Sequence, residues 1–241
     1  MRRWLPILLI ACGQPPGPAY VRRHVDGEAT LPCLAWPQRA FVYRVDPALS
    51  AKTPGDKGRA AIDAAVNSWR AVASSCSDFT YTEDAGVTDN LIVFREQDCT
   101  AVAPAGDPCF NDGTCDSVYD CWDGDAMTLG VTSLTYSRST GDIDQAVVQF
   151  DAAHFLFTNV DAPPCQANAQ STACVASDIQ NTLTHELGHV IGLDHTTAPG
   201  STMAPTAPVG ETSKRVIDPG TKQGFCAIYP AGMPTPSCLS P

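Results

Sequence analysis

The sequence predicts an α+β domain, because both helical and strand patterns occur along the chain. Residues 57–74 repeat apolar side chains at spacings of three and four, at Ile62, Val66, Trp69 and Ala73, which is typical of an amphipathic helix. Four other runs are apolar or alternating but too short for helices, and we interpret them as strands: 41–45, 91–95, 128–136 and 143–150.

Two more helices are expected in the second half of the chain. Ser177 and Gln180 match a capping box, and the apolar stripe that follows them predicts a helix ending at Gly192. Asp218 is a start signal for a last short helix around residues 220–228.

Residues 97–125 differ in character from the segments on either side. They hold four cysteines, several glycines and five aspartates between Asp112 and Asp125, so we interpret them as a loop insertion tied by disulfides. Carboxylates of this kind can bind Ca²⁺, but the spacing lacks the register of an EF-hand. A solvated loop is therefore the favoured interpretation, and a Ca²⁺ site stays without support.

Composition excludes some classes of function. The 241 residues are 44% hydrophobic, as in a globular protein, and no stretch approaches the roughly 18 to 20 apolar residues of a membrane span. The formal net charge of −11 and the absence of a basic run argue against a nucleic-acid partner, because the phosphate backbone would be repelled.

The first residues predict export. Met1-Arg2-Arg3 is a positive stretch, and a short apolar segment from Trp4 to Ala11 follows it. Leu9-Ile10-Ala11-Cys12 matches a lipobox, so we expect cleavage before Cys12 and acylation of that cysteine. An ordinary signal peptide with a coincidental cysteine is the alternative. Gly- and Pro-rich residues after Cys12 indicate a flexible tether over 12–32.

The cysteine count supports export independently. Of 11 cysteines, ten remain if Cys12 carries lipid, and ten can form five disulfides in an oxidising compartment. The pairing cannot be deduced from the sequence. No CxxC is present, which removes the signal for a zinc ribbon or a thioredoxin-type site.

The most specific pattern is a set of histidines at zinc-ligand spacing. His185 and His189 lie four residues apart on the predicted helix, so both rings project from one face toward a single metal ion. Gly192 can adopt the left-handed conformation that ends the helix and returns the chain, which brings His195 back as a third ligand. Three histidines and a water form an open zinc site, and Glu186 is placed to act on that water as a base.

The run from His185 to His195 resembles the extended zinc-binding motif of the metzincins. Met203 looks like the methionine of the Met-turn in that clan, and its Met-x-Pro context resembles matrixins. Astacins and serralysins place a tyrosine ligand where this chain has Pro205, which disfavours those branches. The resemblance to bacterial matrixin-like catalytic domains of lipoprotein type covers about residues 33–230.

The resemblance implies a twisted, mostly parallel sheet with an antiparallel edge strand, an active-site helix and a small irregular C-terminal subdomain. The expected order along the chain is a signal peptide (1–11), the tether (12–32), an upper subdomain (33–192), a lower subdomain (193–230) and a disulfide-tied tail (231–241). Within the edge strand, Leu129, Val131 and Ser133 are expected to line the substrate, and residues 204–209 to form a wall of the pocket after the scissile bond.

The chain also departs from the matrixin pattern. Thr196 stands where a serine usually follows the third histidine, and only His24 and His154 remain outside the motif, so the second, structural zinc of vertebrate matrixins is expected to be absent. No Pro-Arg-Cys-Gly switch is present. Cys33 could cover the zinc in a latent form, although the even cysteine count favours a disulfide.

We therefore expect a zinc-dependent endopeptidase that hydrolyses peptide bonds in extracellular proteins. One alternative is a non-catalytic zinc-binding surface lipoprotein, against which Glu186 argues because a pure binding site needs no base. Another is a hydrolase of non-peptide amides or esters. We also expect a protein or peptide substrate, a monomer, and membrane contact only through the lipid anchor. The expected location is the outer membrane or the cell surface, reached by export, or otherwise secretion.

Overall fold

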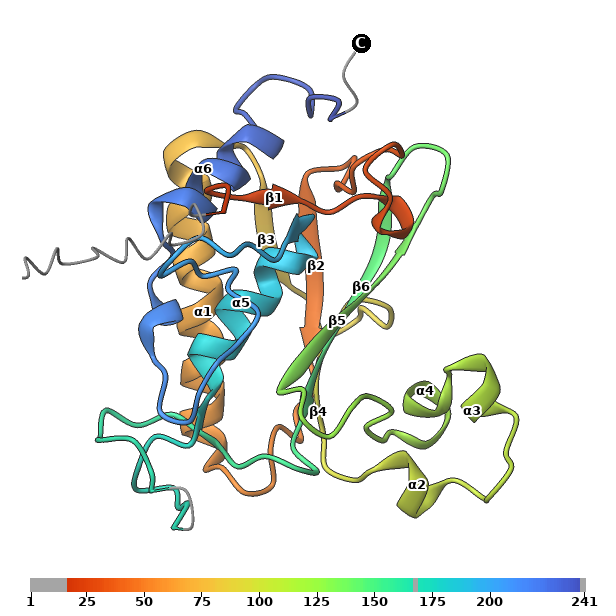
Figure 1. The fold of residues 1–241 in the computed structure, drawn as a ribbon, viewed down its shortest axis with the longest axis vertical. Helices are drawn as coiled ribbons and strands as arrows, with labels where there is room; N and C mark the ends of the chain where they lie inside the picture. The colour runs from red at the N-terminus through yellow and green to blue at the C-terminus, as the bar shows by residue number, and fades with distance from the viewer. Residues whose placement is uncertain (1–16, 167–168, 239–241) are drawn as a thin grey trace, which may run out of the picture.

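A computed structural model describes residues 17–166 and 169–238. The expected signal peptide and the cysteine expected to carry lipid, Cys12, lie outside the described residues. In the described part, the long helices gather beside a mixed five-stranded sheet, and a smaller helical lobe projects from the far end of that sheet (Figure 1).

The central sheet has five strands: β2 (Ala40–Val45), β3 (Thr80–Glu83), β4 (Leu91–Arg95), β5 (Gly130–Tyr136) and β6 (Ile143–Asp151). Their spatial order is β3-β2-β4-β6-β5, and every neighbouring pair is parallel except β5 with β6. The sheet thus has the expected parallel body with an antiparallel edge strand. β5 begins two residues later than predicted because the Thr128 N–H donates to the Asp125 carbonyl in a turn.

Three helices pack beside the sheet: α1 (Gly55–Cys76), α5 (Ile179–Val190) and α6 (Pro219–Ile228). The apolar stripe of α1 faces α5, and α5 in turn contacts β5 and β6. Trp69 is fully buried between these helices, and its Nε1–H donates to the Thr184 carbonyl at 3.0 Å. A buried indole needs such a partner, so this contact fixes the position of α5 against α1.

The predicted N-cap of α5 was wrong by one residue. Ser177 belongs to the short strand β8 (Ser177–Asp178), and the N-cap is Asp178, whose carboxylate accepts from the Asn181 N–H at 2.7 Å. Aspartate and serine are comparable caps, so tertiary contacts decide between them. Asp178 is also ion-paired with Arg215, a contact that the local sequence does not reveal.

The end of α5 is close to the predicted one. The last helical residue is Val190, and Gly192 has a φ of 91°, in the left-handed region that favours glycine. A Cβ at Gly192 would lie 2.3 Å from the Leu34 carbonyl oxygen, so close packing also requires a glycine there. The Trp36 indole and the Tyr229 hydroxyl donate to the last carbonyls of the helix.

The prediction of a flexible tether over residues 12–32 was wrong for its described part, residues 17–32. β1 (Val21–Arg22) pairs antiparallel with β9 (Leu193–Asp194), directly before the third histidine. The single helical turn η1 (Val25–Gly27) follows, and Val25 is fully buried. The Gly- and Pro-rich composition that suggested a tether ends at Pro18, and the apolar residues beyond it bury against the domain.

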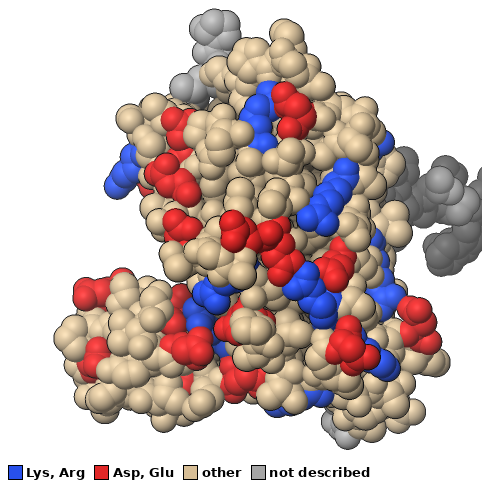
Figure 2. Space-filling model, turned by 180° about the vertical axis from the view of Figure 1, so that it is seen from behind, with Lys and Arg blue, Asp and Glu red and all other residues tan. Residues whose placement is uncertain are grey.

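The insertion at residues 97–125 folds into a small lobe, seen at the lower right of Figure 1. It contains three short helices that were not predicted: α2 (Cys99–Val102), α3 (Cys109–Asp112) and α4 (Cys115–Tyr119). Disulfides Cys99–Cys121 and Cys109–Cys115 form its centre, as the stapled-loop interpretation required. The lobe holds seven aspartates and no Lys or Arg, and acidic side chains are visible on its surface at the lower left of Figure 2.

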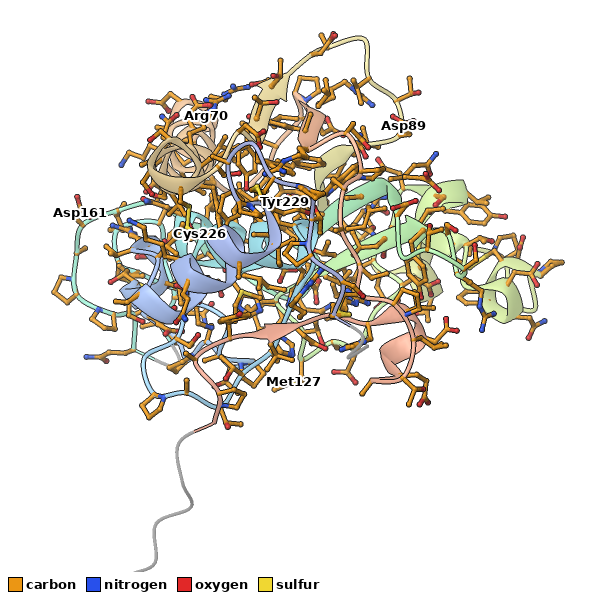
Figure 3. All side chains as sticks on the ribbon, turned by 90° about the horizontal axis from the view of Figure 1, so that it is seen from above. Arg70, Asp89, Met127, Asp161, Cys226 and Tyr229 are labelled. Carbon is orange, nitrogen blue, oxygen red and sulfur yellow. A yellow bond between two sulfur atoms is a disulfide. The ribbon has the colours of Figure 1, made fainter. Side chains whose placement is uncertain are left out.

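All ten cysteines among the described residues form disulfides. Cys76–Cys226 joins α1 to α6, and Cys33–Cys238 ties the C-terminal tail to the N-terminal segment. Figure 3 shows Cys226 and Tyr229 together near the centre of the molecule, whereas Met127 lies at its edge. The C-terminal part of the chain is therefore fastened at two points to the sheet domain.

The remaining elements are short. β7 (Phe157–Thr158) pairs parallel with β8, and η2 (Ser213–Arg215) packs against α5. Within the described ranges, no helix combines the length and the apolar character needed to cross a membrane.

Candidate metal centre and active site

Three imidazole rings converge at the C-terminal half of α5. His185 and His189 project from the helix, and His195 follows β9 after the turn at Gly192. The three Nε2 atoms lie 3.1 to 3.2 Å from one another. The predicted spacing thus brings together all three residues that the sequence singled out as metal ligands.

The backbone fixes the orientation of two of these rings. The Nδ1–H of His185 donates to the Thr202 carbonyl at 2.7 Å, and that of His189 donates to the Leu193 carbonyl at 2.9 Å. A carbonyl can only accept, so Nδ1 carries the proton and Nε2 presents a lone pair. Such contacts orient histidine ligands in metal sites.

The arrangement fits a zinc ion. Burial lowers the pKa of His185 well below its usual value, and burial next to His195 lowers that of His189 to about 4, so both rings are neutral at physiological pH. Three lone pairs that point at each other repel unless a cation lies between them. Tetrahedral nitrogen ligands at about 2.0 to 2.1 Å from zinc are separated by about 3.4 Å, close to the observed separations.

Glu186 is buried next to the histidines and has one strong contact. The Thr132 hydroxyl on β5 donates to Glu186 Oε2 at 2.8 Å. Burial raises the pKa of Glu186 to about 7, although the Thr132 hydrogen bond opposes that rise. A carboxylate whose pKa lies near neutrality can both accept and return a proton, as a general base and acid requires.

Met203 packs against α5 beside the metal centre. It is fully buried, and its carbonyl accepts from the Thr196 N–H in the segment that follows His195. A Cβ at Gly188 would lie 2.3 Å from the Met203 sulfur, so the methionine packs directly on the helix between the two histidine ligands. Asp218, the N-cap of α6, accepts from the Thr202 N–H and holds this turn in place.

The histidines and Glu186 line a cleft of about 1040 Å³. β5 borders one side of the cleft, and residues 205–208 border the other, as expected of a wall at 204–209. The exposed side chain of Met127 lies at the rim, where the chain enters β5. The cleft thus has an open strand edge along its length.

The pairing of β5 with β6 decides which backbone groups lie at the open edge of the sheet. The Leu129 carbonyl accepts from the Asp151 N–H, so Leu129 directs its backbone toward β6. Hydrogen bonds alternate along an antiparallel strand, and Val131 and Ser133 therefore also face β6. Leu129 and Val131 line the cleft, whereas Ser133 is not among its lining residues in the described structure. The backbone groups at the open edge belong to the residues between these three.

Gly130 and Thr132 are two of these intervening residues. A Cβ at Gly130 would lie 3.2 Å from Glu186 Oε1, so the strand passes close over the base. The hydroxyl of Thr132 contacts Glu186 as described. Thr132 could not be singled out from the sequence, because only the pairing of β5 with β6 decides which side chains face α5.

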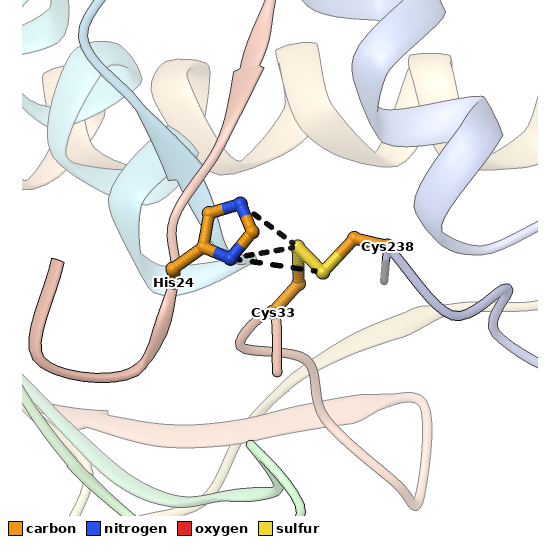
Figure 4. Close-up of side chains that lie close together, drawn as sticks. All are labelled: His24, Cys33 and Cys238. Atoms are coloured by element: carbon orange, nitrogen blue, oxygen red, sulfur yellow. Dashed lines mark hydrogen bonds between the residues drawn. A yellow bond between two sulfur atoms is a disulfide. The ribbon is translucent and has the colours of Figure 1, made fainter. Parts of the chain in front are cut away.

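Cys33 does not offer a thiolate to the metal centre. It forms a disulfide with Cys238, and His24 lies against that bond, with ring nitrogens 3.6 and 3.9 Å from the Cys33 sulfur (Figure 4). The favoured prediction of a disulfide is therefore confirmed. His24, Cys33 and Cys238 are close enough to form a ligand group, but both sulfurs are already bonded to each other.

The acidic segment of the lobe does not assemble into a ligand cluster. Asp116 accepts from Gln149, Asp120 pairs with Arg95, and Asp125 accepts from the Met127 N–H. Across residues 17–166 and 169–238, the two histidine-containing groups described above are the only sets of three potential ligands. Among the described residues, this segment offers no group of ligands that supports a Ca²⁺ site.

Comparison with known proteins adds a family assignment to this geometry. A family model described as Matrixin matches residues 35–230, which is more than half of the chain. No curated protein was found to match the sequence.

We expect Glu186→Gln to change how the stability of the metal-free protein depends on pH. The folded-state pKa of Glu186 is about 7 and its usual value is 4.5, so the folded wild type binds the extra proton between these values. The wild type therefore loses stability relative to the variant as pH rises through this window, by up to about 3 kcal/mol. Urea unfolding of both proteins in a chelator measures the difference. A difference that stays constant with pH would contradict the raised pKa.

Proposed function

Because the chain belongs to the matrixin family, whose members are zinc metalloendopeptidases, we propose that it hydrolyses peptide bonds in proteins outside the cytoplasm. The observation that carries this proposal is Glu186, a buried carboxylate placed beside three converging imidazoles and beneath an open strand edge. A site that only stored zinc would not need a base there.

His185, His189 and His195 would hold the zinc ion through their Nε2 atoms. When bound, zinc supplies a Lewis acid that polarises a carbonyl and makes a water more acidic. Glu186 accepts the proton of the attacking water and returns it to the leaving amine nitrogen. Thr132 holds Glu186 Oε2 and leaves Oε1 for this transfer.

A substrate in extended conformation would add a strand to the open edge of β5. The free backbone groups of Gly130 and Thr132 lie beside Glu186, so hydrogen bonds to them would place the scissile carbonyl at the metal centre. An unpaired edge strand normally promotes aggregation, and binding of substrate is a functional reason to keep this edge open. This arrangement favours extended peptides over small amides or esters.

We further propose that the protein is an exported lipoprotein that acts as a monomer. The lipobox that ends at Cys12 supports the anchor, and five disulfides suit an oxidising compartment. The acyl chains on Cys12 would be the only contact with the membrane.

Proteolysis should require both the metal and the base. Casein cleavage by the zinc-loaded protein should stop in a chelator and resume on addition of Zn²⁺. Glu186→Ala should lower kcat by about 10² to 10⁴ without loss of the fold, because only proton transfer is removed. The matched control is Glu83→Ala, which removes a carboxylate from β3 at the opposite edge of the sheet. Cleavage that survives the chelator or Glu186→Ala would contradict the mechanism.

The mature N-terminus should be an acylated Cys12. Mass spectrometry of the protein purified from membranes should find residues 1–11 removed and lipid on the cysteine, and Cys12→Ser should release the protein from the membrane fraction. An unmodified N-terminus at another residue would refute the anchor and leave the endopeptidase proposal intact.

A further inference from the structure

A buried lysine lies in the wall of the catalytic cleft. Lys214, on η2, lines the cleft together with residues 205–208, and its side chain is only 3% exposed. Lysine is among the residues least often buried, because its charge is costly to remove from water. A cation in this position therefore calls for an explanation.

Within the described structure, Lys214 forms one ion pair, with Glu211, and that pair is too long to be a hydrogen bond. Its Nζ donates to the Ala204 carbonyl at 2.7 Å and to the Thr206 carbonyl at 2.8 Å. The buried Oε2 of Glu211 lies 3.8 Å from Nζ and has no hydrogen-bond partner of its own. An ammonium group has three N–H donors, and among the described residues only two of them have acceptors within hydrogen-bond distance.

The hydroxyl of Thr182, which also lines the cleft, is buried and lacks a hydrogen-bond partner in the described structure. Thr182 lies one helical turn before Glu186 on α5, on the same face. Asn181, the neighbour of Thr182, fixes the backbone of Lys214, because its Oδ1 accepts from the Lys214 backbone N–H at 2.8 Å. Native structures rarely leave a buried hydroxyl unsatisfied, so a ligand group is a reasonable partner.

The direction of the substrate decides which of its residues meets this wall. Antiparallel pairing is the more stable arrangement for a strand that adds to β5. The part of the substrate after the scissile bond then runs toward the N-terminal end of β5, where a Cβ at Gly130 would lie 3.4 Å from the Thr182 methyl carbon. The part before it runs toward Tyr136, where the N-terminal segment contributes Asp26. Lys214 and Thr182 therefore face the residue that follows the scissile bond.

We propose that Lys214 makes the protein select substrates with a carboxylate side chain, aspartate or glutamate, immediately after the scissile bond. The carboxylate would accept from the free Nζ–H of Lys214 and from the Thr182 hydroxyl. An apolar side chain would fill the same space but leave both donors buried without acceptors, which weakens binding. This inference rests on the proposed endopeptidase function and specifies its substrates.

The size of the preference follows from the type of hydrogen bond. A hydrogen bond to a charged group is stronger than a neutral one, and its loss in a buried site lowers kcat/KM by about 10- to 100-fold. Glutamine has nearly the shape of glutamate without its charge, so a glutamate-to-glutamine comparison isolates the contribution of Lys214.

Cleavage of a mixture of proteome-derived peptides tests the inference without a known substrate. Mass spectrometry identifies the new N-terminal residues, which are those that followed the scissile bonds. The wild type should enrich aspartate and glutamate there, and matched peptides should show glutamate above glutamine by at least 10-fold in kcat/KM. Lys214→Met, of similar length and without charge, should remove this preference and raise cleavage before leucine.

Two further variants separate specificity from folding. Lys52→Met also removes a lysine that donates to a backbone carbonyl, that of Ala152, but outside the cleft, and it should keep the wild-type preference. If Lys214→Met fails to fold, Thr182→Val tests the same pocket, and it should reduce the advantage of glutamate.

The failure of this inference can be told from the failure of the endopeptidase proposal. A wild type that cleaves before leucine or other apolar residues as well as before glutamate overturns the inference and supports the proposed activity. A preference for glutamate that is unchanged in both Lys214→Met and Thr182→Val also overturns it. A wild type that cleaves no peptide overturns the endopeptidase proposal and the inference with it.

Discussion

The close approach of three imidazole Nε2 atoms is the constraint on which the rest of the structure depends. Neutral rings with facing lone pairs at 3.1 to 3.2 Å repel one another, so the protein must hold them in place when no cation does. It does so with the carbonyls of Thr202 and Leu193, and by closing both ends of α5. Asp178 with Arg215 closes the start of the helix, and the Trp36 indole and Tyr229 hydroxyl close its end.

The second constraint is the burial of Glu186 beneath β5. Ionising a buried carboxylate is unfavourable, so the burial of Glu186 raises its pKa and destabilises the metal-free protein at neutral pH. A proton-transfer group benefits from the same property, because its pKa matches the working pH. The hydrogen bond from Thr132 joins the sheet edge to the base, so one contact positions both the substrate-binding strand and the proton-transfer group.

The features that could be predicted from the sequence are those encoded over a few residues. The spacing of His185 and His189 needs only the period of a helix, and Gly192 needs only a left-handed turn. Features that depend on distant segments could not be predicted. The register of β5 is set by its pairing with β6, so Thr132 was missed, and Asp178 becomes the cap because Arg215 pairs with it. Lys214 gives no local signal, since its role appears only when residues 204–206 fold around it.

The metal centre can be tested most directly by X-ray absorption spectroscopy of the zinc-loaded protein together with its metal content. The account predicts one zinc per chain, bound by three imidazole nitrogens and one further light atom at about 2.0 to 2.1 Å, with no sulfur ligand. Substitution of His195 by alanine should remove one imidazole from the spectrum and weaken zinc binding. A protein that retains no zinc, or whose zinc is bound by cysteine sulfur, would contradict the assignment of the three histidines.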